Sequence, residues 1–137
     1  MRLTWLAAGL LAITLPACAQ DAPPAAAAPR LPPGSNEMLR AILAEDPNLE
    51  VIISDVIIPP GGQVARHYHP GQEFLYLIEG TAVHVEEGQP DRPLKAGDTY
   101  VIPPQAIHSP RGGPNGARAI VFRVHVKGQP ERIEAPR

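Results

Sequence analysis

Four side chains able to bind a metal ion occur at spacings that a β-sheet can bring together. His67 and His69 are one residue apart, and because side chains alternate between the faces of a strand, both imidazoles point the same way. A Pro-Gly turn signal follows, and Glu73 then begins the next apolar segment, while His108 lies beyond a separate strand-like segment. Three imidazoles and one carboxylate suit Fe, Mn, Ni, Cu or Zn, and four ligands leave one or two coordination positions open for water, oxygen or substrate.

From Leu49 onward the composition of the chain is typical of a β protein. Segments rich in β-branched and apolar residues, bounded by Gly and Pro, are expected to form strands at 51–58, 74–78, 81–86, 99–102 and 117–126. Many short strands separated by Gly and Pro residues predict an all-β sandwich or jelly-roll barrel. Such a barrel would bring His108 to the same interior point as the other three side chains.

A short N-terminal helix is predicted before the first strand. Asn36 would be its N-cap, and Met38, Ala41 and Ile42 would form its apolar face. The helix would end near Glu45, because the proline at position 47 disfavours helix in the residue before it.

Residues 1–19 are interpreted as an export signal. They contain a basic residue near the start, an apolar run over 3–15, and small residues at the end. The apolar run is too short to span a bilayer comfortably. Cleavage is expected either after Ala19 or before Cys18, where Leu-Pro-Ala-Cys resembles a bacterial lipobox that would attach a lipid anchor to the Cys18 thiol. Either cut predicts an exported protein, periplasmic or tethered to the outer membrane.

The remaining chain divides into a linker and one domain. Residues 20–35 are rich in Ala and Pro and are expected to form an extended linker, which leaves 36–137 as the folded domain. Cys18 is the sole cysteine of the chain, so no disulfide is expected. A formal net charge of −2 and an aromatic content of 4% argue against nucleic acid as a partner.

Two sequence motifs resemble those of the cupin family. Gly61-(five residues)-His67-Tyr-His69-(three)-Glu73-(six)-Gly80 is similar to the first cupin motif, and Gly97-(five)-Pro103-(four)-His108 is similar to the second. The resemblance covers about residues 61–112. It implies a double-stranded β-helix barrel with one divalent transition metal, Fe²⁺ favoured, bound by His67, His69, Glu73 and His108. Gln105 stands where the second motif usually has glycine, and Gly112 where it usually has asparagine.

Three functions are compatible with such a site. The first is a metal-dependent oxygenase, similar to quercetin-dioxygenase-like small cupins, in which Glu73 could also act as a base. The second is a metal-dependent isomerase or lyase, for which Tyr76 or Tyr100 would supply proton transfer if either points inward. The third is a non-enzymatic binding module. Each would take a small molecule, and the resemblance together with the long apolar strand at 51–58 implies a homodimer.

The sequence also predicts where several other side chains lie. His84 and His125 are interpreted as packing or surface residues rather than ligands. Arg66 and Arg111 flank metal ligands in the sequence and are expected to be surface charges, with an anionic substrate as the alternative. The aromatic side chains of the strands are expected mainly in the core.

Overall fold

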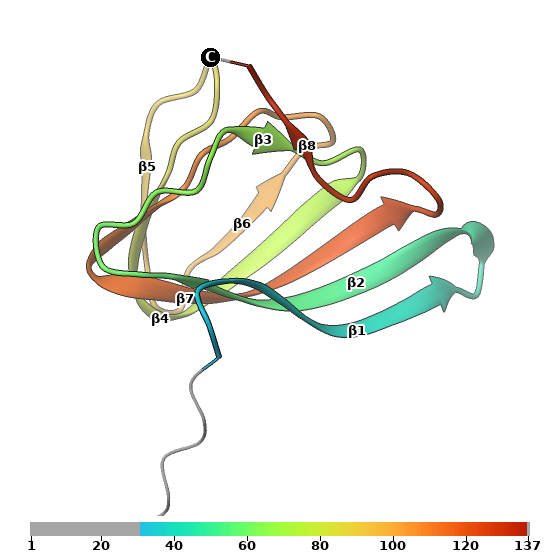
Figure 1. Cartoon of the computed structure of the whole chain (residues 1–137), viewed down its shortest axis with the longest axis horizontal. Coiled ribbons are helices and arrows are strands. Elements are labelled where there is room, and N and C mark those ends of the chain that lie inside the picture. The colour runs from blue at the N-terminus through green and yellow to red at the C-terminus, as the bar shows by residue number, and fades with distance from the viewer. Residues whose placement is uncertain (1–30, 137) are drawn as a thin grey trace, which may run out of the picture.

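A computed structural model describes residues 31–136, which form an all-β fold (Figure 1). The strands are β1 (Gly34–Leu43), β2 (Asp46–Ile58), β3 (His67–Tyr68), β4 (Gln72–His84), β5 (Arg92–Lys95), β6 (Thr99–Ile102), β7 (Arg111–Val126) and β8 (Ile133–Glu134). The all-β prediction is confirmed. No helix able to cross a membrane occurs in this described range. The export signal, the Cys18 anchor and most of the linker lie outside the described residues and stay predictions.

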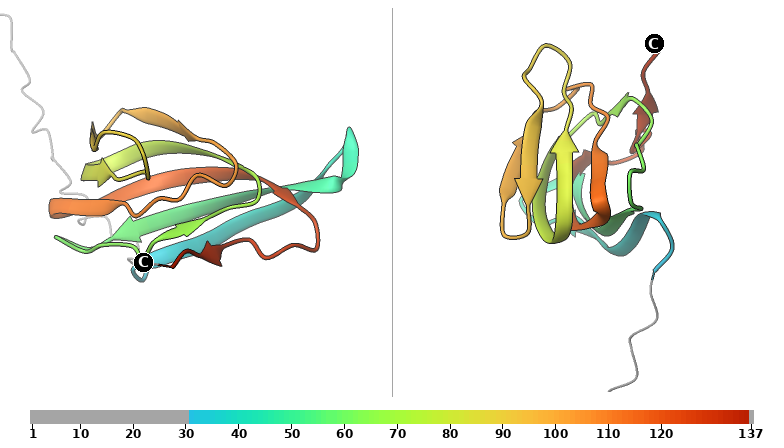
Figure 2. Two further views of the ribbon diagram at one scale, coloured as in Figure 1. Left: turned by 90° about the horizontal axis from the view of Figure 1, so that it is seen from above. Right: turned by 90° about the vertical axis from the view of Figure 1, so that its left-hand side faces the viewer.

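Six strands form one curved sheet and two form another. The order in the large sheet is β1-β2-β7-β4-β5, and β6 also pairs with β4. The small sheet is the antiparallel pair β3-β8. Figures 1 and 2 show the large sheet curved around an interior that β3 and β8 cover from the opposite side. Strand β3, which precedes β7 in the sequence, and strand β8, which follows it, therefore cover the same interior.

The helix predicted over 36–45 is wrong, because residues 36–43 lie in β1 and the next two form a turn. The strand pairs with β2 in antiparallel register from Gly34↔Ile57 onward. Pairing satisfies the row of backbone groups that β2 would otherwise expose at the edge of the sheet, whereas a helix this short is marginal without tertiary packing. The apolar face expected to pack the helix is in fact solvated, with Met38 61% and Ile42 48% exposed.

Strand β4 contains the segment 74–78 and most of the segment 81–86, which were expected to be separate strands, and it ends at His84. Its pairing with β7 is irregular on either side of Gly80. Gly80 has a φ of 76°, and a Cβ there would lie 2.1 Å from the carbonyl oxygen of Gly116. Only glycine fits this bend, which lets one strand carry Glu73 near its start and His84 at its end, both buried.

The inner faces of the strands form the core. Ile58, Leu77, Ala82, Leu94 and Ala117 make up one buried apolar cluster. Strand 99–102 and the inward alternation of β7 agree with the sequence prediction. The core leaves the space in which the candidate site lies.

The outer face of the large sheet is also apolar. One row crosses five strands in register, because β-pairing links Val101 to Phe74, Phe74 to Phe122, Phe122 to Ile53, and Ile53 to Leu39. Four of these side chains are 37–46% exposed, all except that of Ile53. The strand aromatics Phe74 and Phe122 are therefore not core residues, contrary to the expectation for them.

Candidate metal centre

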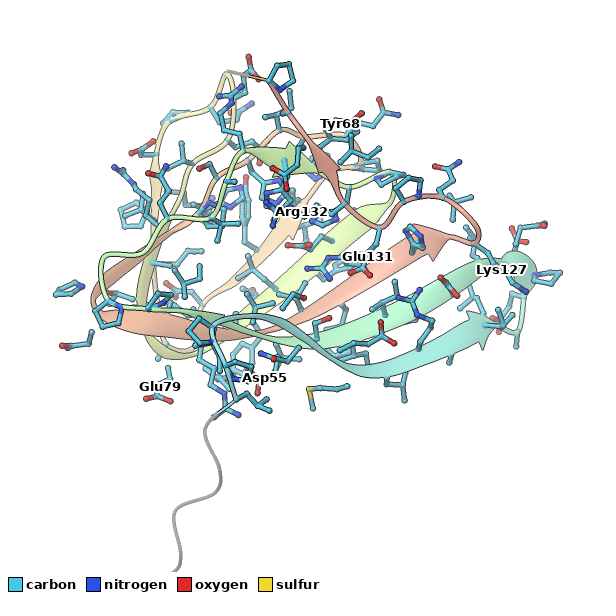
Figure 3. The ribbon with its side chains drawn as sticks, in the orientation of Figure 1. Asp55, Tyr68, Glu79, Lys127, Glu131 and Arg132 are labelled. Carbon is cyan, nitrogen blue, oxygen red and sulfur yellow. The ribbon has the colours of Figure 1, made fainter. Side chains whose placement is uncertain are left out.

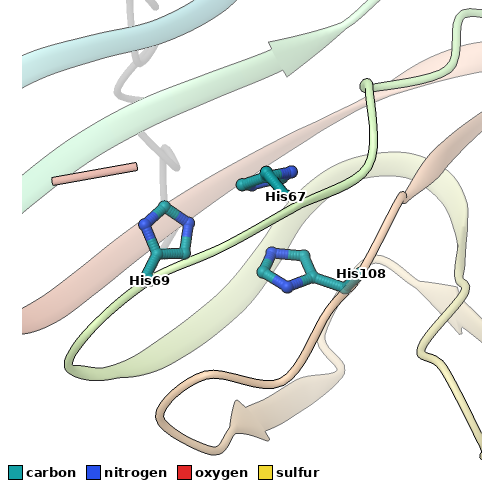
Figure 4. Close-up of side chains that lie close together, drawn as sticks. All are labelled: His67, His69 and His108. Carbon is teal, nitrogen blue, oxygen red and sulfur yellow. The ribbon is translucent and has the colours of Figure 1, made fainter. Parts of the chain in front are cut away.

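Backbone pairing fixes two of the predicted ligands relative to each other. The His67 amide donates to the His108 carbonyl at 3.0 Å, and the His108 amide donates back at 2.8 Å. Their ring centroids are 4.2 Å apart. His69 lies two residues further along the first segment, and its ring centroid is 4.9 Å from that of His67. Figure 4 shows the three rings gathered around a common space.

Hydrogen bonds to carbonyl oxygens set the tautomer of all three rings. Nδ1 lies 2.8 Å from Ala65 O in His67, 2.9 Å from Ala106 O in His108, and 2.6 Å from Glu131 O in His69. A carbonyl only accepts, so each Nδ1 carries the hydrogen and each Nε2 is a bare lone pair. Such partners orient the rings of histidines that ligate metals.

The three side chains fit a divalent transition metal. One ring nitrogen from each of His67, His69 and His108 lies within 4.8 Å of the other two, and all three residues are buried. Nε2 of His69 is buried without a hydrogen-bond partner in the described chain, although Glu73 Oε2 is 3.2 Å away. Two lone pairs that face each other repel, and a cation between them would turn this repulsion into coordination.

Burial keeps these rings uncharged. Desolvation, followed by the charge of His108, lowers the pKa of His67 to about 3. Desolvation is also the main cause that lowers the pKa values of His69 and His108. Neutral imidazole is the form that binds metals, so these rings need lose no proton when a cation arrives at neutral pH.

Glu73 lies beside the three histidines but outside the group that they form. Its Oε2 accepts a hydrogen bond from Nε of Arg123 at 2.6 Å, and both side chains are about 7% exposed. Its role as fourth ligand stays a prediction, since the carboxylate is engaged by Arg123.

Arg123 and Glu131 were not predicted as site residues. Arg123 Nη1 donates to Glu131 Oε1 at 2.7 Å, and the Glu131 carbonyl accepts from His69. Glu131 lies on the segment between β7 and β8, near the middle of the view in Figure 3. An arginine at an inward position of β7 was a visible signal in the sequence. The position of Glu131 depends on long-range folding and had no local signal.

The turn before His108 tolerates its departure from the second motif. Gln105 has a φ of 64°, and it is the one non-glycine residue with positive φ in the described chain. Glycine adopts this conformation without strain, which explains why the motif usually has it. The Gln105 amide donates to the His69 carbonyl at 2.8 Å, so the turn is tied directly to the metal centre.

The structure separates the two candidate tyrosines. Tyr100 is half-buried, and its hydroxyl lies 3.3 Å from Glu86 Oε2. Tyr76 is 45% exposed on the outer face of the sheet, so it is not brought to the site. Arg66 and Arg111 form exposed ion pairs with Glu87 and Asp91, respectively.

An apolar cavity of about 130 Å³ adjoins the candidate metal centre, and His67 and His108 line it. Its walls come mainly from aliphatic side chains of the core. Its polar lining includes His67, His108, Glu73, Arg123 and His84. The space therefore suits a small molecule that is largely apolar and has polar groups at one end.

The fold and the three-histidine centre define a β-barrel protein with a candidate metal site. Residues 54–129 match the family model described as a cupin domain. The chain belongs to the cupin family. Its resemblance to that family at the sequence level is thereby confirmed.

Similar proteins include dioxygenases and a cupin of known structure. The chain is 30% identical to a 3-hydroxyanthranilate 3,4-dioxygenase from Jannaschia sp., over 75% of this chain and 56% of that protein. It is 33% identical to the enzyme of the same name from Mycosarcoma maydis, over 56% and 46%. A cupin-like protein from Thermotoga maritima superimposes with a TM-score of 0.54 at 28% identity, over 62% and 64%. The chain spans about half the length of the curated relatives it matches.

We expect acid to destabilise the metal-free protein. The three histidines have lower pKa values in the folded chain than the usual 6.5, so below that pH the unfolded state binds more protons. The contribution of these histidines to the free energy of unfolding should be fully present above pH 6.5. It should fall toward pH 3, by up to about 1.4 kcal/mol per pH unit for each histidine. Urea unfolding at pH 7 and pH 5 measures this. In His67→Gln the free energy of unfolding should depend less on pH. An equal change between pH 7 and pH 5 in this variant and the wild type would contradict the lowered pKa of His67.

Loss of any one histidine of the centre should weaken metal binding. His67→Ala, His69→Ala and His108→Ala are each expected to reduce affinity by more than the roughly 10–100-fold that loss of an outer partner costs. His125→Leu is the matched control, because His125 is also buried but bonds Gln129 O through Nε2. Isothermal titration with Zn²⁺ measures the affinities. Equal affinities in the three variants and the wild type would exclude this site.

Proposed function

We propose that this cupin is an iron-dependent dioxygenase that acts on a small hydroxylated aromatic molecule. The observation that carries the proposal is the convergence of one ring nitrogen from each of three buried histidines beside an apolar cavity. The relatives named 3-hydroxyanthranilate 3,4-dioxygenase support the reaction class. The small apolar cavity supports a substrate of the size of a single ring.

The polar residues at the metal centre have separate tasks in this proposal. His67, His69 and His108 would hold Fe²⁺, which supplies Lewis-acid and redox chemistry there when bound. Arg123 holds the carboxylate of Glu73 at the edge of the cavity. Glu73 would then accept the proton of the substrate hydroxyl, and the aliphatic walls would keep water away from the reacting groups.

The Fe²⁺-loaded protein should consume oxygen with such a substrate. A dioxygenase places both atoms of O₂ in the product, so one O₂ should disappear for each substrate molecule. An oxygen electrode and product mass spectrometry over a panel of aminophenols and catechols measure this. His108→Ala should lose at least about 100-fold in rate, as expected when a site loses its electrostatic catalyst, whereas His125→Leu should retain activity.

Two other outcomes would exclude the dioxygenase. Turnover under strictly anaerobic conditions with no change in oxidation state would favour the isomerase or lyase. Tight binding of the panel by the Fe²⁺-loaded protein without any turnover would favour the binding module.

We also propose that the outer face of the large sheet joins two copies of this chain. Its cross-strand row places Val101, Phe74, Phe122 and Leu39 in solvent, and Tyr76 extends the row along β4. Soluble monomers rarely expose a contiguous apolar patch of this kind. A twofold axis would let the same row cover itself in the partner.

A charge in the centre of this row should separate the two copies. Phe122→Asp is expected to halve the mass measured by light scattering, because an unpaired carboxylate cannot be buried in an apolar interface. Gln89→Asp adds the same charge in the exposed turn after β4 and should leave the mass unchanged. A monomeric wild type, or a dimeric Phe122→Asp protein, would contradict the proposal.

A further inference from the structure

A second polar cluster lies beside His108 and reaches the cavity through one of its residues, His84. It consists of His84 at the end of β4, Glu86 just after it, and Tyr100 in β6. Nε2 of His84 is 3.1 Å from Glu86 Oε2, and the Tyr100 hydroxyl is 3.3 Å from the same oxygen. The His84 side chain is 2% exposed and lines the cavity. Its ring centroid is 5.5 Å from that of His108.

Backbone pairing holds this cluster against the metal centre. Glu86 and His108 form an antiparallel bridge. The amide of Glu87 donates to Ile107 O and that of Ser109 donates to Val85 O, both at 2.9 Å. The distance between the two clusters is therefore set by main-chain hydrogen bonds rather than by flexible side chains.

The hydrogen bonds of the cluster give His84 the opposite tautomer to the three candidate ligands. A carboxylate only accepts, so Nε2 of His84 carries the hydrogen and Tyr100 donates its hydroxyl to Glu86. Burial, followed by the charge of Glu86, raises the pKa of Tyr100, which keeps that hydroxyl a donor. In the neutral His84 ring Nδ1 is then a bare acceptor, and no hydrogen bond to it occurs among residues 31–136.

An acceptor in an apolar cavity calls for a donor on the ligand. A ring nitrogen that takes no hydrogen from its own chain can accept one from a ligand, and the lining near His84 is mostly aliphatic. The three ligand histidines satisfy their own Nδ1 hydrogens on carbonyl oxygens, so they do not compete for this role.

We infer that His84 is a specificity-determining residue whose Nδ1 accepts a hydrogen bond from a hydroxyl or amino group of the metal-bound substrate. The inference rests on the proposed function for the metal-binding end of that substrate. It narrows the substrate class to molecules that carry a further donor next to the chelating oxygens. Glu86 and Tyr100 act through His84 and are positioning residues.

The tautomer can be tested without metal or ligand. Long-range ¹H–¹⁵N NMR of the full chain with labelled histidine distinguishes the two neutral forms. We expect the Nε2–H form for His84 and the Nδ1–H form for His67, His69 and His108. An Nδ1–H form at His84 would overturn the inference while leaving the proposed function intact.

The acceptor role can be tested with two matched probes. Pyrogallol and 3-fluorocatechol share the chelating pair of hydroxyls, but fluorine replaces the third hydroxyl with a group of similar size that cannot donate. Anaerobic calorimetry of the Zn²⁺-loaded full chain gives the ratio of the two dissociation constants. We expect the preference for pyrogallol to be about threefold to tenfold greater in the wild type than in His84→Phe, the worth of one hydrogen bond.

Control variants and outcomes separate the two proposals. Tyr76→Phe, on the outer face, should keep the wild-type ratio, and Zn²⁺ content and thermal stability report whether His84→Phe remains folded. Equal ratios in wild type and His84→Phe would overturn the role of His84, although both probes still bind. Failure of the wild type to bind either probe would overturn the proposed function, and the role of His84 with it.

Discussion

The centre depends on three neutral imidazoles whose Nδ1 hydrogens are all donated to backbone carbonyls. These bonds leave one unprotonated nitrogen on each ring, in a group of three buried histidines. The arrangement is costly for an empty apolar interior, since buried polar atoms without partners destabilise the fold. It becomes favourable once a cation is shared among them, because binding to the native state alone adds to folding stability.

The rest of the barrel holds this arrangement in place. The His67–His108 pair exchanges two main-chain hydrogen bonds, so neither candidate ligand can move without breaking the pairing. His69 is held by the Glu131 carbonyl, and the Glu131 carboxylate in turn holds Arg123. Breaking a buried ion pair on one side is far more costly than never forming it. The C-terminal segment is thus part of the centre, although no ligand lies on it.

The sequence predicted the parts of the site that depend on local rules. The alternation of His67 and His69 follows from strand geometry, and the strand over 99–102 follows from its β-branched composition and its Gly and Pro boundaries. The helix over 36–45 was wrong because pairing with β2 outweighs a weak helical pattern. The apolar periodicity of Met38 and Ile42 did not mark a buried face either, because both side chains are exposed on β1.

The features of the site that could not be predicted from the sequence depend on long-range contacts. Arg123 was visible as an inward position on β7, yet its pairing with Glu73 depends on the β4–β7 register. His84 was interpreted as a packing or surface residue, because alternation alone cannot show which side chains share its face. The pairing of β4 with β7 is irregular on either side of Gly80, and residues before and after this point, Glu73 and His84, both line the cavity.

The opposite tautomers of His84 and the three candidate ligands divide the cavity chemically. A ring whose Nδ1 hydrogen is donated to a carbonyl offers Nε2 to a cation, whereas a ring whose Nε2 hydrogen is donated to a carboxylate offers Nδ1 to the cavity. His108 and His84 are close enough for one small molecule to meet both. A molecule that binds at both places needs metal-coordinating atoms at one end and a hydrogen-bond donor for His84 at the other. The polar partners behind the rings, rather than the rings themselves, therefore decide which ligand the barrel accepts.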